Sequence, residues 1–424
     1  MKSIPASSDH IATWLIAGIA ILGVIVRPAR VSEAVWAVLG ATALVLFSLV
    51  SAADAFAAVR AGTDVYLFLT GMMVLAELAR REGLFDWLAA YAVRGARGSA
   101  SRLFLLIYAV GILVTVFLSN DATAVVLTPA VYAATRDAGA PPLPYLFICA
   151  FIANAASFVL PISNPANLVV YGASLPPLMH WLAQFAIPSL ASIVATYFLL
   201  RFTQRAQLAG TIARDVAVPP LTTGGRVAAG GIAATAVLLS ASSALGGALG
   251  LPTFLAGAVA WIAVMLVHRA APWAVFKGVS WSVLPLVAGL FVLVKGVDGT
   301  GVLAPLSRYL PASAHAAPNG TAFAVGAIAA LACNLVNNLP LGLAAGHLAS
   351  AAQLSAHLTG ALLVGVDLGP NLSVTGSLAT ILWLLALRRE GLQVSGLRFL
   401  MLGSVVMPLA LTAALLGFVL VKAL

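Results

Sequence analysis

The stretch FLSNDATAVVLTP, residues 117–129, puts a serine, an asparagine and an aspartate in the middle of an apolar segment that runs from Leu103 to Ala134. A second stretch, ACNLVNNLP at residues 332–340, does the same between Ala322 and Ala345. A polar group without a partner is expensive in hydrocarbon, so polar residues at membrane depth usually line a solute pathway or a contact between helices. Two such clusters, at corresponding places in the two halves, favour the pathway and indicate a secondary transporter.

The composition places the whole chain in a membrane. Of its 424 residues, 62% are hydrophobic and 8% are charged, whereas about 25% of the residues of a soluble domain are charged. Spans of about 20 residues with short connections allow roughly ten to twelve crossings and leave no room for a soluble domain. We therefore expect an all-α polytopic membrane protein.

Charge indicates orientation rather than a nucleic-acid partner. The net charge is +9, but no basic run with interleaved aromatic residues occurs, so we expect no nucleic acid to bind. Cytoplasmic connections collect lysine and arginine. A scheme with the N-terminus outside puts most of these residues inside, among them Arg27, Arg80, Arg136 and Arg388. This bias predicts a multi-pass protein of the cell (inner) membrane.

The order of segments repeats. Each half contains three spans, a short amphipathic helix, a segment interrupted by a polar cluster, a long interrupted span and a closing span. We interpret the two polar-centred segments as re-entrant hairpins. Five spans per half is an odd number, so the second half enters the membrane from the opposite side and forms an inverted repeat. The predicted units are an N-terminal repeat (1–203) with hairpin 103–134 and broken span 143–170, a cytoplasmic linker (204–225), and a C-terminal repeat (226–424) with hairpin 322–345 and broken span 358–387.

The long spans are broken by related sequences, PISNPAN at 161–167 and DLGPNLSVTGS at 367–377. Proline removes a donor and clashes with the preceding turn, while glycine lets the backbone turn freely, so a helix stops and restarts at each place. Asn, Ser and Thr beside a break can cap the new helix. Such breaks are tolerated only beside protein or a water-filled cavity.

Two hairpin tips and two breaks predict one site near the membrane midplane, the arrangement that inverted-repeat transporters use. The alternative is that these polar residues only hold helices together by hydrogen bonds. The candidate substrate-binding residues are Ser119, Asn120, Asn154, Ser163, Asn164, Asn167, Asn334, Asn337, Asn338, Thr375, Gly376 and Ser377.

Asp121 and Asp367 are the acids deepest in this site. A carboxyl group at such depth is a candidate for proton coupling; the alternative is a carboxylate that caps a helix. Cys149 and Cys333 lie in apolar segments beside the site. A thiol there would suit a soft metal or metalloid, although a buried cysteine is also a common small hydrophobe.

No sequence signal for an enzyme is present. The nucleotide motif GxxxxGK[ST], the zinc motif HExxH and the acyl-transfer motif GxSxG are all missing from the sequence. We therefore expect no catalytic residues, no resident metal and no cofactor, and transport driven by an ion gradient or by a partner.

The chain resembles the arsenite efflux permeases of the ion transporter superfamily. The resemblance lies in FLSNDATAVVLTP (117–129), VDLGPNLSVTGSLATILW (366–383), NNLP (337–340) and GLFDW (83–87). It implies export of trivalent arsenic and antimony in exchange for protons by alternating access, assisted in some members by a cytoplasmic ATPase. Arsenite is an uncharged trihydroxy compound at neutral pH, so Asn, Ser and Thr donors and acceptors suit it.

Two alternatives remain. The segment SNPAN at 163–167 departs from the arsenite permeases and is similar to related anion and sodium carriers, which would make the protein a sodium/proton antiporter or a sodium-coupled carboxylate transporter. The chain could also be the membrane channel subunit of an ATPase-driven arsenite pump. The sequence leaves the oligomeric state open.

Overall fold

The chain folds into helices, as its composition predicts. A computed structural model describes residues 8–28, 31–214, 216–268 and 273–423, and within them it contains helices and no strand. Seven helices are long and apolar enough to cross a membrane, or up to nine if each bent pair counts as one span. The prediction of an all-α polytopic membrane protein is confirmed.

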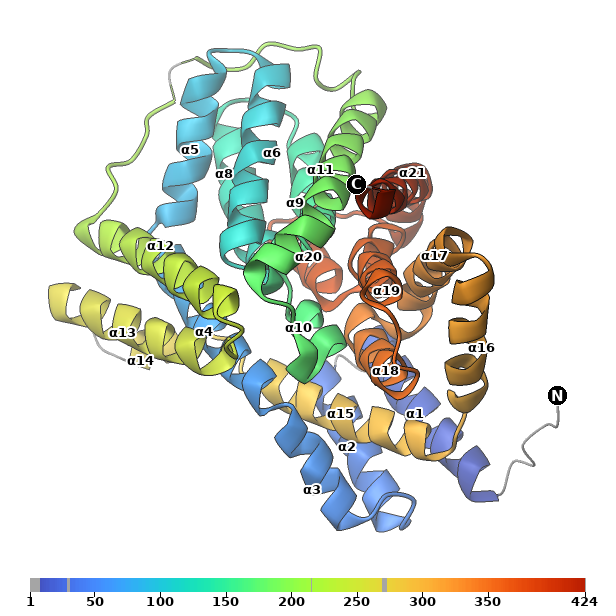
Figure 1. The fold of residues 1–424 in the computed structure, drawn as a ribbon. Coiled ribbons are helices and arrows are strands. Elements are labelled where there is room, and N and C mark those ends of the chain that lie inside the picture. Colours follow the sequence, from blue (N-terminus) through green and yellow to red (C-terminus); the bar gives the residue numbers. More distant parts are fainter. Residues whose placement is uncertain (1–7, 29–30, 215, 269–272, 424) are drawn as a thin grey trace.

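The first half begins with five helices, continues with the elements of the two interrupted segments and ends with a long helix (Figure 1). Its elements are α1 (Ser8–Val26), α2 (Glu33–Leu46), α3 (Ala52–Ala61), α4 (Thr63–Arg81), α5 (Leu84–Ala96), α6 (Ala100–Phe117), α7 (Asn120–Ala122), the π-helical turn η2 (Thr123–Leu127), α8 (Thr128–Asp137), α9 (Leu143–Ala155), the 3₁₀ turn η3 (Pro161–Ser163), α10 (Pro165–Tyr171), η4 (Gly172–Ser174) and α11 (Leu178–Thr203).

The second half repeats this order of long, short and broken elements. They are α12 (Thr223–Ala244), α13 (Gly250–His268), α14 (Trp273–Gly278), α15 (Val283–Gly299), α16 (Ala304–Ala316), α17 (Pro318–Val336), α18 (Asn338–Ala351), α19 (Ala356–Leu368), the 3₁₀ turns η5 (Gly369–Asn371) and η6 (Val374–Gly376), α20 (Leu378–Arg389) and α21 (Gly396–Ala423). The opposite orientation of the two halves in a membrane stays a prediction.

The two halves exchange packing partners. Helix α4 of the first half packs on α13 of the second, and α15 of the second packs on α2 of the first. Both contacts are close because a glycine faces the partner's backbone. A Cβ on Gly71 would lie 2.2 Å from the carbonyl oxygen of Thr253, and a Cβ on Gly289 would lie 2.7 Å from the carbonyl carbon of Ala37. The halves are therefore interlocked and not simply adjacent.

The two ends of the segment from α6 to α8 lie side by side at the linker. The backbone amide of Ile212, in the linker, donates to the carbonyl of Gly98 just before α6, at 3.1 Å. The next amide, that of Ala213, donates to the carbonyl of Ala138 just after α8, at 2.9 Å. Figure 1 shows α5, α6 and α8 together at this end. Two arms whose ends share one linker form a hairpin.

The two ends of the segment from α17 to α18 also lie close together. Pro318, the first residue of α17, and Ser355, four residues beyond the end of α18, line one cavity of about 350 Å³. The helix is interrupted at Asn337, between α17 and α18. Helix α16, which precedes this hairpin, is bent by 81° from α15.

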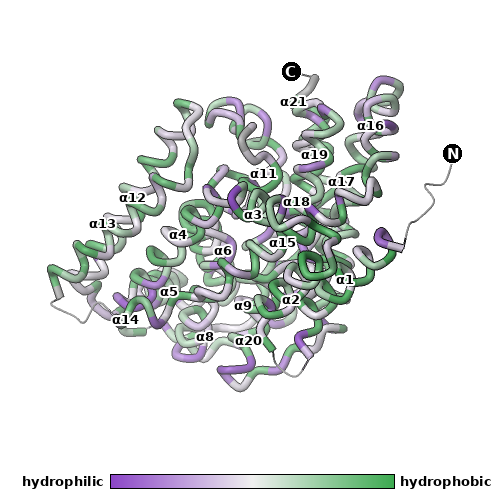
Figure 2. Tube along the Cα trace, turned by 90° about the horizontal axis from the view of Figure 1, so that it is seen from below, coloured by the Kyte–Doolittle hydropathy of each residue, from purple (hydrophilic) through white to green (hydrophobic). Residues whose placement is uncertain are grey.

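The broken spans form the centre of the molecule. All but the first residue of α9 and the first two of α19 are buried, as expected for helices that are apolar on every side. Outer helices such as α1 and α13 expose large apolar side chains. Figure 2 shows mostly hydrophobic residues along the helices and hydrophilic ones gathered in connections, for example near α5 and α14.

Candidate functional site

The first hairpin tip is organised by Ser119. Helix α6 ends at Phe117, Ser119 is extended, and its Oγ accepts a hydrogen bond from the amide of Ala122 at 3.1 Å. The hydroxyl groups of Thr115 and Thr123 lie 2.8 Å apart and bridge the two arms. A serine N-cap satisfies an amide that the new helix would otherwise leave unpaired. These hydrogen bonds therefore hold the sharp turn of the tip.

The first helix break, between α9 and α10, is held by two polar side chains. Asn167 Nδ2 donates to the carbonyls of Ser157, Leu160 and Pro161, at 2.9 to 3.2 Å. Ser163 Oγ donates to the carbonyl of Val116 in α6, at 3.1 Å, so the break is fastened to the first hairpin. These side chains replace the helical partners that the break removes.

The second break, between α19 and α20, is bound to the second hairpin by Asn334. Its Nδ2 donates to the carbonyl of Gly369 at 3.1 Å, and its Oδ1 accepts from the Ser373 hydroxyl at 2.6 Å. The Thr375 hydroxyl donates to the carbonyl of Asn334 at 2.9 Å. Each hairpin is thus tied to the broken span of its own half.

The second hairpin tip carries backbone strain. Asn337 has φ 73° and ψ 152°, a region that residues other than glycine rarely adopt. Its Nδ2 donates to the carbonyl of Thr375 at 3.3 Å, and its Oδ1 accepts from the amide of Leu339 at 3.4 Å. Strained residues persist where the surroundings fix them, often at functional sites.

One capping pattern occurs at the four places where a new helix begins after a hairpin tip or a helix break, which we call the restarts. In each of them the residue before the new helix is extended or strained, and its own side-chain oxygen accepts an amide of the first turn. The sequence predicts such caps at the two helix breaks. The four caps are Ser119 before α7, Asn164 before α10, Asn337 before α18 and Ser377 before α20.

Two side-chain hydrogen bonds join the halves at the centre. Asn164 Nδ2 donates to Oδ1 of Asp367 at 2.8 Å, and Asn154 Nδ2 donates to Oδ1 of Asn371 at 2.9 Å. Asn371 Nδ2 in turn donates to the carbonyl of Phe151 at 3.0 Å. All four side chains are buried. The first broken span is therefore bound to the second.

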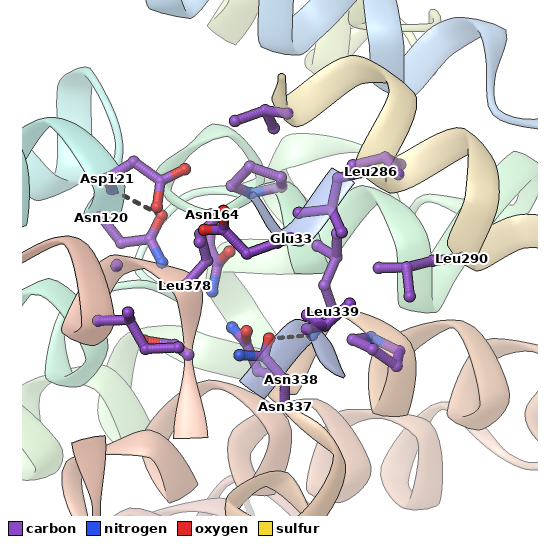
Figure 3. A pocket seen from close by; sticks show the side chains of 18 of the residues that line it. Glu33, Asn120, Asp121, Asn164, Leu286, Leu290, Asn337, Asn338, Leu339 and Leu378 are labelled. Atoms are coloured by element: carbon purple, nitrogen blue, oxygen red, sulfur yellow. Dashed lines mark hydrogen bonds between the residues drawn. The ribbon is translucent and has the colours of Figure 1, made fainter. Parts of the chain in front are cut away.

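A narrow cavity of about 30 Å³ lies between the four restarts and the outer helices. Figure 3 shows Asn120 and Asp121 on one side of it, Asn337 and Asn338 on another, and Asn164 near the middle. Ser377 also lines it, and the facing wall is apolar and comes largely from α15. The lining contains amides, a hydroxyl and carboxyl groups, and no lysine, arginine or histidine among the residues described.

Glu33 also lines this cavity, which the sequence analysis did not anticipate. It is the first residue of α2 and forms an ion pair with Arg27. A glutamate at the predicted end of a span is expected to extend towards water, so its position gave no signal.

The predicted site residues fall into two groups. Asn120, Asp121, Asn164, Asn337, Asn338 and Ser377 line the cavity. The others do not line it and instead hold the breaks, the tips or the joint between halves: Ser119, Asn154, Ser163, Asn167, Asn334, Asp367, Thr375 and Gly376.

The cysteines lie away from the cavity lining. Cys149 contacts the carbonyl of Tyr145 at 3.7 Å, one turn earlier in α9, and Cys333 contacts the carbonyl of Val366 at 3.3 Å. Both thiols are buried and free. In the described part of the chain no group of three or more His, Cys, Asp or Glu side chains could hold a metal ion.

A second, much larger cavity of about 1170 Å³ lies on the other side of the α10 and α18 pair. It is lined by α3 and α15 on one wall and by α10 and α18 on the other, with Lys295 and Asp298 among its polar groups. His347 of α18 contacts Asp298 of α15 at 3.3 Å. This cavity is far larger than the narrow cavity between the restarts.

Comparison with known proteins identifies the family. The model of the citrate transporter family CitMHS matches residues 15–367. An arsenical pump membrane protein of Yersinia enterocolitica is 26% identical over 338 residues, covering 76% of this chain and 78% of that protein. An uncharacterised transporter of Mycobacterium tuberculosis is 25% identical over 408 residues, covering 92% of this chain and 94% of that protein.

Among solved structures, the YdaH transporter of Alcanivorax borkumensis has a similar fold. Its TM-score is 0.53 and its sequence identity is 17%, and the match covers 87% of this chain and 86% of that one. At this identity the likeness concerns the fold alone. With the family match over most of the chain and the apolar helices, it follows that this multi-pass membrane transporter belongs to the citrate transporter family CitMHS.

Proposed function

We propose that the protein exports trivalent metalloids, arsenite and antimonite, in exchange for protons. The observation that carries this proposal is the lining of the narrow cavity. Asn120, Asn164, Asn337, Asn338 and Ser377 offer amide and hydroxyl groups that can both donate and accept. Arsenite, a neutral trihydroxy compound, needs donors and acceptors and no fixed positive charge.

The cavity between the restarts is small. A volume of about 30 Å³ accommodates a few waters at most, since one water needs roughly 10 to 15 Å³ by this measure. Relatives that share about a quarter of the residues are named arsenical pump membrane proteins. Asp121 lines the cavity, and the described residues give its carboxylate no hydrogen bond or ion pair, so we assign it the transported proton, with Asp367 as the second candidate.

In this proposal the unit that moves consists of the two hairpins and the two broken spans, which the bonds of Asn164 and Asn154 hold together. The units 1–203 and 226–424 form an inverted repeat in the inner membrane, joined by the linker 204–225. The outer helices would stay in place while the restarts face each side in turn.

A second candidate cargo is a carboxylate such as citrate. The family model carries that description, and α18 and α20 direct their N-termini at the cavity, where the helix dipole favours an anion. Against it stand two carboxyl groups, those of Asp121 and Glu33, in a lining without a cationic side chain.

The deciding experiment measures uptake into everted membrane vesicles from cells that lack their own arsenite exporter. An inwardly acidic proton gradient is imposed without ATP, and arsenite, antimonite and citrate are compared for wild type and Asp121→Asn. We expect uptake of arsenite and antimonite that the variant loses. Citrate uptake alone would replace the proposed cargo by the second candidate.

Three further outcomes of this assay would contradict the mechanism. Uptake that needs sodium would identify a sodium-coupled carrier. Uptake that survives an uncoupler and needs ATP would identify the membrane subunit of an ATPase-driven pump. Uptake by Asp121→Asn at the wild-type rate would exclude Asp121 from coupling and leave Asp367 as the candidate.

A further inference from the structure

The narrow cavity contains a carboxyl group that neither a hairpin tip nor a helix break supplies. Glu33 is at the start of α2, an outer helix that packs on α15, whereas every other polar residue of the lining comes from a hairpin tip or a helix break. Its side chain is 12% exposed. Figure 3 shows Glu33 in the middle of the site, beside Asn164. The cavity therefore joins a carboxyl of the restarts, that of Asp121, to a carboxyl of the outer helices.

Among the residues that the structure describes, Glu33 has one basic partner. Arg27, just beyond α1, forms an ion pair with it, and the two side chains are 17% and 12% exposed. Burial lowers the pKa of the Arg27 guanidinium to about 10, so Arg27 stays protonated at neutral pH. The residues of α15 that line the cavity are apolar: Val283, Leu286, Val287 and Leu290. Within the described residues, Arg27 and Asp121 are the charged groups that Glu33 faces.

The position of this pair defines a direction. Arg27 lies in the connection between α1 and α2, which the arginine distribution predicts to be cytoplasmic. On this prediction, the end of the cavity at Glu33 faces the cytoplasm. Both carboxyl groups line the cavity, whose volume has room for two or three waters, and a carboxyl pair joined by water can exchange a proton.

We propose that Glu33 is a proton-coupling residue, the group through which a proton leaves Asp121 for the cytoplasm; the inference rests on the proposed proton exchange. In this step the carboxyl of Asp121 gives its proton through water to the Glu33 carboxylate. The protonated Glu33 loses its attraction to Arg27 and then releases the proton to cytoplasmic water. Arg27 re-forms the ion pair and resets the group.

The test separates proton coupling from cargo binding. Everted vesicles carry wild type, Glu33→Gln or Glu33→Asp, and the cargo is whichever of arsenite and citrate the wild type accumulates. Two rates are measured: uptake driven by an inwardly acidic gradient, and exchange of labelled for unlabelled cargo without a gradient. Exchange uses only the cargo-loaded carrier and needs no proton transfer.

We expect Glu33→Gln to exchange cargo at the wild-type rate and to lose gradient-driven uptake by roughly 100-fold, the lower range for a removed proton-transfer group. Glu33→Asp should retain both activities. Arg27→Gln should need a more alkaline external medium for uptake, because Glu33 then releases its proton without help from a positive neighbour. In everted vesicles that medium contacts the cytoplasmic face.

Each other outcome overturns the inference. Gradient-driven uptake by Glu33→Gln at the wild-type rate would show that Glu33 takes no part in proton transfer. Loss of both activities in Glu33→Gln with retention in Glu33→Asp would assign Glu33 to cargo binding. Loss of both activities in both variants would make the ion pair structural. Wild type that accumulates neither cargo under a proton gradient would overturn the proposed function itself, and this inference with it.

Discussion

Asn164 and Asp367 are hydrogen-bonded across the two halves of the chain, with 2.8 Å between Nδ2 of the first and Oδ1 of the second. The Oδ1 of the same asparagine caps α10 through the amide of Ala166 at 3.0 Å. Asp367 is fully buried, and its second oxygen, Oδ2, has no hydrogen-bond partner among the residues described. One asparagine thus fixes a helix start and binds it to the other broken span.

This relationship predicts different results for two substitutions of Asp367. Asp367→Asn keeps an Oδ1 that accepts from Asn164 and should fold as wild type does. Asp367→Ala leaves the Asn164 amide without its partner and should lower the free energy of unfolding by about 1 to 3 kcal/mol, the penalty for an unpaired buried group. Thermal unfolding of the purified proteins in detergent measures both.

Transport by Asp367→Asn then decides the role of the carboxyl. If Asp367 only joins the halves, the folded asparagine variant should transport at the wild-type rate. If it carries the proton, that variant should exchange cargo but not accumulate it under a gradient. An asparagine variant as unstable as the alanine variant would contradict the hydrogen-bond account.

The Asn154 and Asn371 pair predicts a measurable coupling between the halves. Their side chains are 2.9 Å apart and buried, and hydrogen bonds between helices in membranes contribute about 0.6 to 2 kcal/mol. We expect a double-mutant cycle of Asn154→Ala and Asn371→Ala to give a coupling energy in that range. Strictly additive effects on unfolding would show that the bond does not stabilise the joint.

How far the sequence predicts the structure depends on how local the cause is. The caps Asn164 and Ser377 follow from residues next to one another, because proline and glycine stop a helix and Asn or Ser caps the next one. The apolar content likewise predicts the helical fold. These features need no knowledge of which segments meet.

Features that depend on distant contacts were not predictable in this way. Asn154 was a candidate for cargo binding, but its amide is used on Asn371, 217 positions later. Thr375 was another, and its hydroxyl donates to the carbonyl of Asn334. Glu33 reaches the cavity only because α2 packs on α15. The residues next to a polar side chain in the sequence do not show whether it lines a cavity or forms hydrogen bonds within the surrounding protein.

The strained backbone of Asn337 predicts that one substitution there changes thermal stability and transport in different ways. Glycine adopts φ 73° and ψ 152° without steric penalty, so Asn337→Gly should relieve strain of about 1 to 3 kcal/mol and lose two side-chain hydrogen bonds. We expect thermal stability near or above that of wild type, with cargo uptake strongly reduced because the amide no longer faces the cavity.

Asn337→Ala is the matched control for this prediction. It removes the same amide and keeps the strain, so it should be less stable than Asn337→Gly by the strain energy alone. Equal stability of the two variants would mean that the positive φ costs nothing. Undiminished uptake by Asn337→Gly would remove Asn337 from the cargo site.

Gly376 predicts a steric effect on the second break. A Cβ at this position would lie 2.5 Å from Cα of Pro370 and 2.8 Å from Oδ1 of Asn334, distances that force backbone to move. Gly376→Ala should therefore displace the start of α20, where Ser377 lines the cavity, and weaken the Asn334 contacts.

Gly210→Ala is the control, because a Cβ there has nothing within 4 Å. We expect Gly376→Ala to bind cargo poorly and to unfold at a lower temperature, while Gly210→Ala matches wild type in both measurements. A Gly376→Ala protein with normal cargo affinity would show that the second break tolerates movement and does not shape the site.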